Sequence, residues 1–190
     1  MKKLFIILIV ILTASILASC ANSASNANGG KEETTTANNP GTTLTIGEDA
    51  LNFTVGENNV KITPNLEAKP VIEALGEPLE YIESPSCGFE GMDKTYKYNG
   101  FVIDTVTLSG TEFIYVVQIT NDLVTTPEGV YVGMSADDIK AIYKDKFSIV
   151  NNNVMVEFTN GIMTCFIKNG VCTNITYEST TIPNLQVNEK

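Results

Sequence analysis

The chain has 190 residues and a formal net charge of −10, with 22 acidic against 12 basic side chains. It contains no His and no Trp, and every basic residue is Lys. Without imidazole there is no Ser-His-Asp or Cys-His nucleophile and no His ligand for a metal. An acidic surface without Arg repels a phosphate backbone. We therefore expect a protein that is not an enzyme and that has no cofactor, no metal site and no nucleic-acid partner.

The start of the chain has the layout of an export signal. Met1-Lys2-Lys3 carries positive charge, residues 4–12 are an apolar run, and Leu17-Ala18-Ser19-Cys20 ends the segment with small residues. The run is too short for a stable membrane span. The closing tetrapeptide resembles a bacterial lipobox, which implies a signal peptide over 1–19 and a lipidated Cys20. We expect acyl chains on Cys20 to anchor the protein at the extracytoplasmic face of the cell membrane.

Residues 20–42 are rich in Ala, Asn, Ser, Gly and Thr without an apolar period, which predicts a disordered tether. A first folded repeat is predicted over 43–122. It begins with short alternating strands, and Pro70 fits the first position of a helix that Gly76 ends. A meander follows, with Asn99-Gly100 as a hairpin turn. The expected strands are 44–46, 51–55, 60–62, 95–98, 101–108 and 113–120.

The same order of elements returns over 123–182, before a tail at 183–190. Ser135 is suited to cap a second helix, and Asn169-Gly170 predicts another hairpin turn. The expected strands are 130–133, 154–158, 162–168 and 171–177. We therefore predict an α+β fold of two tandem helix-plus-antiparallel-meander repeats that share one sheet, with the helices packed on one face.

Three cysteines, Cys87, Cys165 and Cys172, follow the lipobox. An exported protein meets an oxidising environment, so one disulfide and one odd thiol are one outcome. If Lys168 pairs with Val171 across the hairpin turn, Cys165 lies one diagonal step from Cys172 on the same face. Diagonal positions are usually too far apart for a relaxed disulfide. We therefore expect three reduced, partly buried thiols, with the disulfide as the alternative.

The predicted recognition elements are one loop and one strand face. The loop Ser84–Met92 is the longest in the predicted fold, and it offers apolar surface to a partner. The alternative is an ordered crossover whose side chains fill the core. On the next strand, two tyrosines share a face and suit stacking on a sugar or a peptide, with solvent-side decoration as the alternative. The candidate binding residues are Cys87, Phe89, Met92, Tyr96 and Tyr98.

Two segments, Ser86–Tyr98 and Thr126–Gly133, resemble uncharacterised lipoproteins of Gram-positive anaerobes. Leu75-Gly76-Glu77-Pro78 matches the way those proteins close the first helix, whereas Lys144 stands where they have Gly after the second. The tandem architecture is similar to β-lactamase-inhibitor-protein-like folds and to assembly lipoproteins of the BamE or SmpA type, which bind other proteins. The resemblance to the lipoproteins of Gram-positive anaerobes covers about 60–178. The similarity to the protein-binding folds is a fold-level analogy, and it implies binding and not catalysis.

These observations predict a non-catalytic extracytoplasmic lipoprotein that binds a protein or a cell-envelope ligand on an open sheet face or at the Ser84–Met92 loop. One alternative is a structural or assembly subunit of the cell envelope. Another is a lipoprotein that binds a small molecule. An exposed apolar patch favours a partner interface, whereas a deep polar pocket favours a small ligand.

Overall fold

The computed structural model of the protein describes residues 53–56 and 59–183. The predicted signal peptide, Cys20, the tether, the first expected strand and nearly all of the predicted tail lie outside the described residues. Within the described ranges, no helix is long and apolar enough to cross a membrane.

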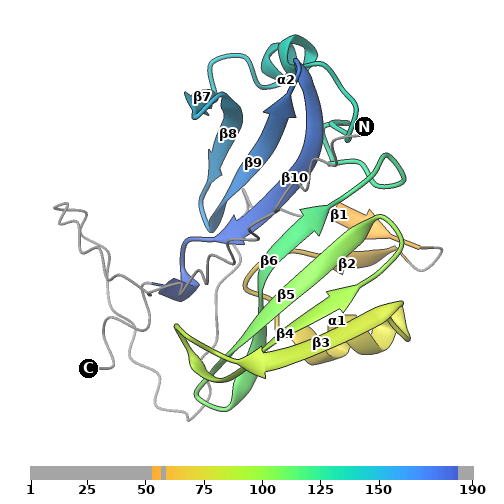
Figure 1. Cartoon of the computed structure of the whole chain (residues 1–190), viewed down its shortest axis with the longest axis vertical. Coiled ribbons are helices and arrows are strands. Elements are labelled where there is room, and N and C mark those ends of the chain that lie inside the picture. The colour runs from red at the N-terminus through yellow and green to blue at the C-terminus, as the bar shows by residue number, and fades with distance from the viewer. Residues whose placement is uncertain (1–52, 57–58, 184–190) are drawn as a thin grey trace, which may run out of the picture. The chain divides into compact units, whose positions relative to one another are not determined.

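An eight-stranded antiparallel sheet dominates the described chain (Figure 1). Its strand order is β3-β4-β5-β6-β10-β9-β8-β7, so β6 and β10 lie at the centre and β3 and β7 at the edges. The strands are β3 Glu80–Pro85, β4 Glu90–Lys97, β5 Phe101–Leu108, β6 Thr111–Ile119, β7 Phe147–Val150, β8 Asn153–Phe158, β9 Gly161–Lys168 and β10 Val171–Ser179. A separate hairpin pairs β1, Phe53–Val55, with β2, Val60–Ile62.

Two helices of 8 residues each accompany the strands, α1 at Ala68–Leu75 and α2 at Ala136–Tyr143. Helix α1 begins two residues before Pro70 and ends where predicted, at Gly76, which has a φ of 77°. Helix α2 begins after Ser135, as predicted, because the Ser135 hydroxyl accepts a hydrogen bond from the Asp138 N–H at 3.1 Å.

The local turn signals agree with the structure. Asn169 and Gly170 both have positive φ and join β9 to β10, with Lys168 paired to Val171 as predicted. Gly100 lies between β4 and β5 with a φ of 95°. A Cβ there would stand 2.8 Å from the Asn121 side chain, so this position requires glycine.

Three expectations about strands were wrong. The segment 130–133 is a turn, in which the Met134 N–H donates to the Tyr131 carbonyl at 3.2 Å. Two strands, β3 and β7, form where we expected no strand. Both lie at sheet edges with mostly exposed side chains, so neither shows the apolar alternation by which a half-buried strand is recognised.

The main core lies between one side of the sheet and a mixed cover. Fully buried strand residues such as Ile103, Val117 and Ile175 form its floor. The cover comes from α1 and α2, from the β1–β2 hairpin through Phe53, and from the connection that carries Val124. In Figure 1, α1 and the β1–β2 hairpin lie behind β3–β6.

The predicted fold class is therefore wrong. The described chain is mostly β, with one large sheet, one small two-stranded sheet and only two short helices. It is not a pair of helix-plus-meander repeats with helices forming the layer on one face. The physical reason is the length of the helices: two turns bury few side chains, so the hairpin and the loops must supply the rest of the cover.

We expect Ile119→Ala to destabilise the protein strongly, because Ile119 is fully buried where β6 meets β10. The free energy of unfolding should fall by about 2–5 kcal/mol. The matched control is Ile82→Ala on edge strand β3, where the side chain is 44% exposed and the expected loss is below about 1 kcal/mol. Urea unfolding of both variants measures the difference, and equal losses would contradict this description of the core.

Candidate functional site

One side of the large sheet is not used for the main core. Along β5, β8, β9 and β10, buried residues alternate with half-exposed or exposed ones. The half-exposed positions align into two rows that run across the strands. We call these rows the open face. The first row is Glu80, Lys97, Val102, Gln118, Thr176, Thr164, Met155 and Ser148, and the second is Ile82, Thr95, Asp104, Val116, Glu178, Ile162 and Glu157.

The open face mixes apolar and polar side chains whose orientation is held by hydrogen bonds. At its centre, Asp104 accepts from the Thr95 hydroxyl at 2.6 Å and from the Gln118 amide at 2.9 Å. Val102, Val116 and Ile162 lie beside these groups in the same rows and are only partly buried. Apolar and hydrogen-bonded polar side chains thus lie next to each other at the centre of the open face.

The charge of the open face is negative. Its rows contain four carboxylates and one lysine, and the Lys97 ammonium is 2.7 Å from the Glu80 carboxylate. Glu178 accepts a hydrogen bond from the Tyr115 hydroxyl at 3.0 Å. Burial, followed by the nearby charge of Glu178, raises the pKa of Tyr115 to about 12, so this phenol stays protonated as the donor.

A second polar cluster surrounds Glu112 on β6, on the core side of the sheet. The carboxylate accepts from the Lys94 ammonium at 2.8 Å, the Thr105 hydroxyl at 2.6 Å and the Tyr96 hydroxyl at 3.0 Å. Burial acts to raise the pKa of Glu112, but these three hydrogen bonds and the Lys94 charge outweigh it and lower the pKa. Because its oxygens are already occupied by donors, Glu112 stabilises the sheet and is poorly suited to accept a proton from a substrate.

The five candidate residues from the sequence do not form one site. The segment expected to be the longest loop is instead the β3–β4 hairpin, in which the Ser86 hydroxyl accepts from the Phe89 N–H at 2.9 Å. Phe89 packs edge-on against Tyr115, with the two ring centres 5.4 Å apart, within a small second core. Cys87 is exposed in the turn, and Met92 is half-buried in β4.

The two tyrosines of the predicted strand face serve packing. Tyr96 joins the Glu112 cluster, and burial raises its pKa. Tyr98 stacks on Phe101 with ring centres 5.0 Å apart, and its hydroxyl donates to the Gly76 carbonyl at 3.2 Å. Both side chains pack against the main core, whereas Phe89 packs against the second core. The strand face predicted for stacking is therefore largely covered.

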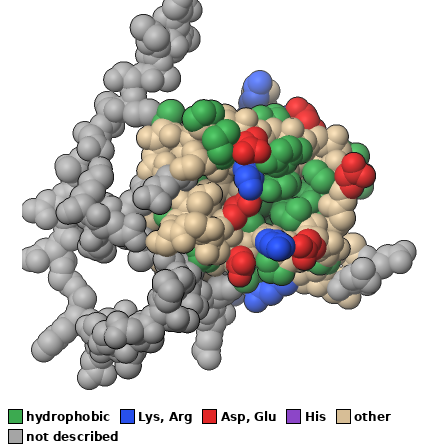
Figure 2. Space-filling model, turned by 90° about the horizontal axis from the view of Figure 1, so that it is seen from below, with side chains coloured by type: hydrophobic (Ala, Val, Ile, Leu, Met, Phe, Trp, Pro, Cys, Tyr) green, Lys and Arg blue, Asp and Glu red, His purple; other side chains and the backbone are tan. Residues whose placement is uncertain are grey.

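Exposed hydrophobic side chains also gather at the β3 edge. Leu79, Tyr81 and Ile82 are 77%, 47% and 44% exposed. Seen from below, Figure 2 shows hydrophobic side chains interspersed with acidic and basic ones. Tyr81 donates to the Glu83 carboxylate, and this hydrogen bond raises the pKa of Tyr81 to about 12.

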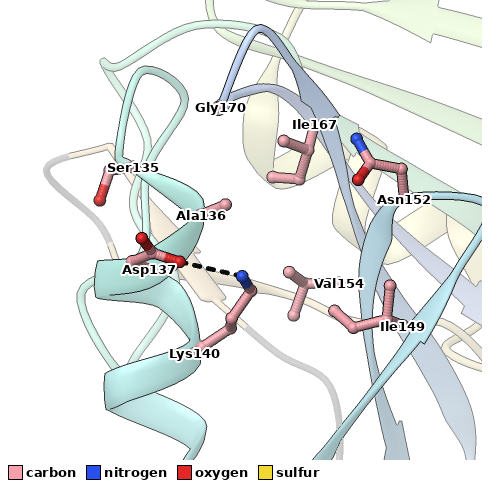
Figure 3. A pocket seen from close by; sticks show the side chains of 9 residues that line it. All are labelled: Ser135, Ala136, Asp137, Lys140, Ile149, Asn152, Val154, Ile167 and Gly170. Carbon is pink, nitrogen blue, oxygen red and sulfur yellow. Dashed lines mark hydrogen bonds and ion pairs between the residues drawn. The ribbon is translucent and has the colours of Figure 1, made fainter.

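Two pockets lie away from the open face. One, of about 470 Å³, is lined by apolar residues such as Leu75, Phe101 and Leu123 and also by polar ones, Thr54, Asn99 and Thr125. The other, of about 320 Å³, lies between α2 and the strands β7, β8 and β9 (Figure 3). Its lysine, Lys140, is 2.9 Å from the Asp137 carboxylate within the same helix. Among residues 53–56 and 59–183, no acidic or cysteine side chains cluster in a way that could hold a metal ion.

No protein-family model and no curated protein matches the chain. Among solved structures, it is similar to an extracellular protein containing a SCP domain from Bacillus anthracis, with 11% identity, a TM-score of 0.47, and coverage of 77% of this chain and 51% of that one. The chain thus spans about half the length of that protein. It is also similar to the uncharacterized protein yfeY from Escherichia coli, with 11% identity, a TM-score of 0.40, and coverage of 71% and 99%.

The structure predicts a pH-dependent role for Glu112. Because its pKa in the folded state lies below the ordinary value of 4.5, its stabilisation is present above that pH and is lost as the pH falls through the lowered value. We expect Glu112→Gln to reduce the free energy of unfolding at pH 7 by on the order of 1 kcal/mol. The difference in the free energy of unfolding between this variant and wild type should become smaller at acidic pH. Urea unfolding across pH measures this, with exposed Glu157→Gln as a control expected to match wild type.

Proposed function

We propose that the protein is a non-catalytic binding module, held at the extracytoplasmic face of the membrane by a lipidated Cys20, that docks a partner protein on the open face. The observation that carries this proposal is the pair of rows of half-exposed side chains across the sheet. One side of these strands is occupied by the main core, and the other presents oriented polar groups among apolar ones.

The dimensions of the open face suit a protein. Strands about 4.8 Å apart make an eight-stranded row about 34 Å wide before twist. Protein interfaces bury on the order of 800 Å² on each partner, which such a surface can supply. Small molecules are instead enclosed on several sides. A basic partner surface would complement the negative charge, so added salt should weaken the complex.

The alternative of a small-molecule-binding lipoprotein is supported by one specific feature. The pocket of about 470 Å³ beside Tyr98 and Phe101 has the size that small ligands use, and its lining combines apolar residues with polar ones. The alternative of a structural or assembly subunit of the envelope would use the open face in the same way, but permanently.

Photo-crosslinking tests the open face. We expect p-benzoylphenylalanine at Gln118 or Thr164, in the full chain in intact cells, to give one discrete protein adduct. The matched control places the same group at Glu73 on α1, whose side chain is 67% exposed. Thr164→Lys should lower the yield of this crosslinked adduct at least tenfold, because the added positive charge repels a basic partner. Adducts of equal yield from the control position, or none from the open face, would refute the proposal.

Fractionation tests the anchor separately. We expect Cys20→Ala to move the protein from the membrane fraction to the soluble or secreted fraction, because one or more acyl chains supply its membrane affinity. Mass spectrometry of the wild-type N-terminus should show an acylated Cys20. An unmodified N-terminus at another residue, with membrane association unchanged in Cys20→Ala, is the result that excludes lipid anchoring through Cys20.

A further inference from the structure

The pocket of about 470 Å³ is formed where four segments meet around the main core. They are the end of β1, the last residue of α1, the β4–β5 turn and the connection after β6. Phe101 and Val124 are 5% and 7% exposed, so they line its deepest part. Half-buried Val55, Leu75 and Tyr98 form the walls. The interior of this pocket is therefore predominantly apolar.

The mouth of the pocket is polar but carries no charge. Thr54, Asn99 and Thr125 are exposed lining residues that offer two hydroxyl groups and one amide. Leu123 is 64% exposed and adds apolar area at the mouth. Of the described residues that line this pocket, none is charged, although the whole chain has a net charge of −10. An ion that entered would lose water without gaining a counter-charge, so the pocket selects against charged molecules.

The aromatic wall is held in place by contacts within the protein. The Tyr98 and Phe101 rings are stacked with an angle of 14° between their planes, and the Tyr98 N–H donates to the Phe101 carbonyl at 2.9 Å. Phe101 also packs edge-on against Phe53, with the ring centres 6.0 Å apart. A wall that is already ordered loses little conformational freedom when a ligand binds. Its aromatic side chains suit stacking on a planar apolar group.

We propose that this pocket binds a neutral, amphipathic small molecule. Its apolar ring or short chain lies against Phe101 and Leu75, and its hydroxyl or amide group hydrogen-bonds at the polar mouth. The pocket volume falls within the range of about 300–1,000 Å³ over which small-ligand sites occur. Because the pocket lies away from the open face, this inference does not depend on the docking proposed there.

Two dyes that share one carbon skeleton test the selection against charge. N-phenyl-1-naphthylamine is neutral, and 8-anilino-1-naphthalenesulfonate is the same molecule with one sulfonate group added. Both fluoresce strongly when they move from water into an apolar site. Each dye is titrated into the full chain carrying Cys20→Ala, so that no acyl chain takes up the dye. We expect saturable binding of the neutral dye and at least about tenfold weaker binding of the anionic one.

Tryptophan substitutions locate the bound dye. Thr125→Trp places a large side chain at the mouth and should weaken binding of the neutral dye at least about tenfold, because the indole occupies its space. Thr54→Trp is a second blocking variant. The matched control is Thr159→Trp, at an exposed threonine in the β8–β9 turn outside the pocket, which should bind the dye like the parent chain. Dye taken up by the apolar run at 4–12 is common to all variants and cancels in the comparison.

A lysine at the mouth separates the effect of the pocket from that of the acidic protein as a whole. Thr125→Lys should strengthen binding of the anionic dye several-fold, whereas Thr159→Lys changes the net charge equally and should have a smaller effect. Circular dichroism verifies that each variant is folded. The proposal is overturned if the parent chain shows no saturable binding of the neutral dye, if both folded blocking variants bind it unchanged, or if the two dyes bind equally well.

Discussion

The pairing of β6 with β10 is the contact on which the rest of the structure depends. Four residue pairs, from Ile119 with Ile175 to Val116 with Glu178, join the two halves of the sheet. One of these pairs, Val117 with Tyr177, is fully buried or nearly so. Contacts between strands so distant in sequence carry a large loop-closure cost, which burial of this central row must offset. Without this pairing, the open face would divide into two surfaces of four strands each.

Local signals in the sequence predicted local structure well. The turn at Asn169-Gly170 and the cap at Ser135 were correct because each depends on a few adjacent residues. The fold class was not correct, because it depends on what covers the sheet. Edge strand β3 illustrates the difficulty: its residues include two Glu, a Ser and a Pro, and all are exposed, so no hydrophobic pattern marks it as a strand.

The candidate site shows a similar limit. We predicted binding roles for Tyr96, Tyr98 and Phe89 because they are aromatic. Aromatic side chains stabilise a protein most when they are buried, and the fold uses these three for packing. The alternation that creates the open face was visible within single strands. What could not be predicted is the register between β6 and β10, which sets Gln118 beside Thr176 and makes the rows continuous.

The edges of the sheet strengthen the case for the open face. An unpaired edge attracts other strands, and proteins guard it with charge, proline or short length. On β3, Glu80 and Glu83 supply charge and Pro85 has no N–H to donate, while β7 has only 4 residues. Association through main-chain pairing is thereby disfavoured at both ends. Under the proposed function, a partner on the open face would instead contact side chains such as Gln118, and these can be substituted without disturbing the buried row on the other side of the sheet.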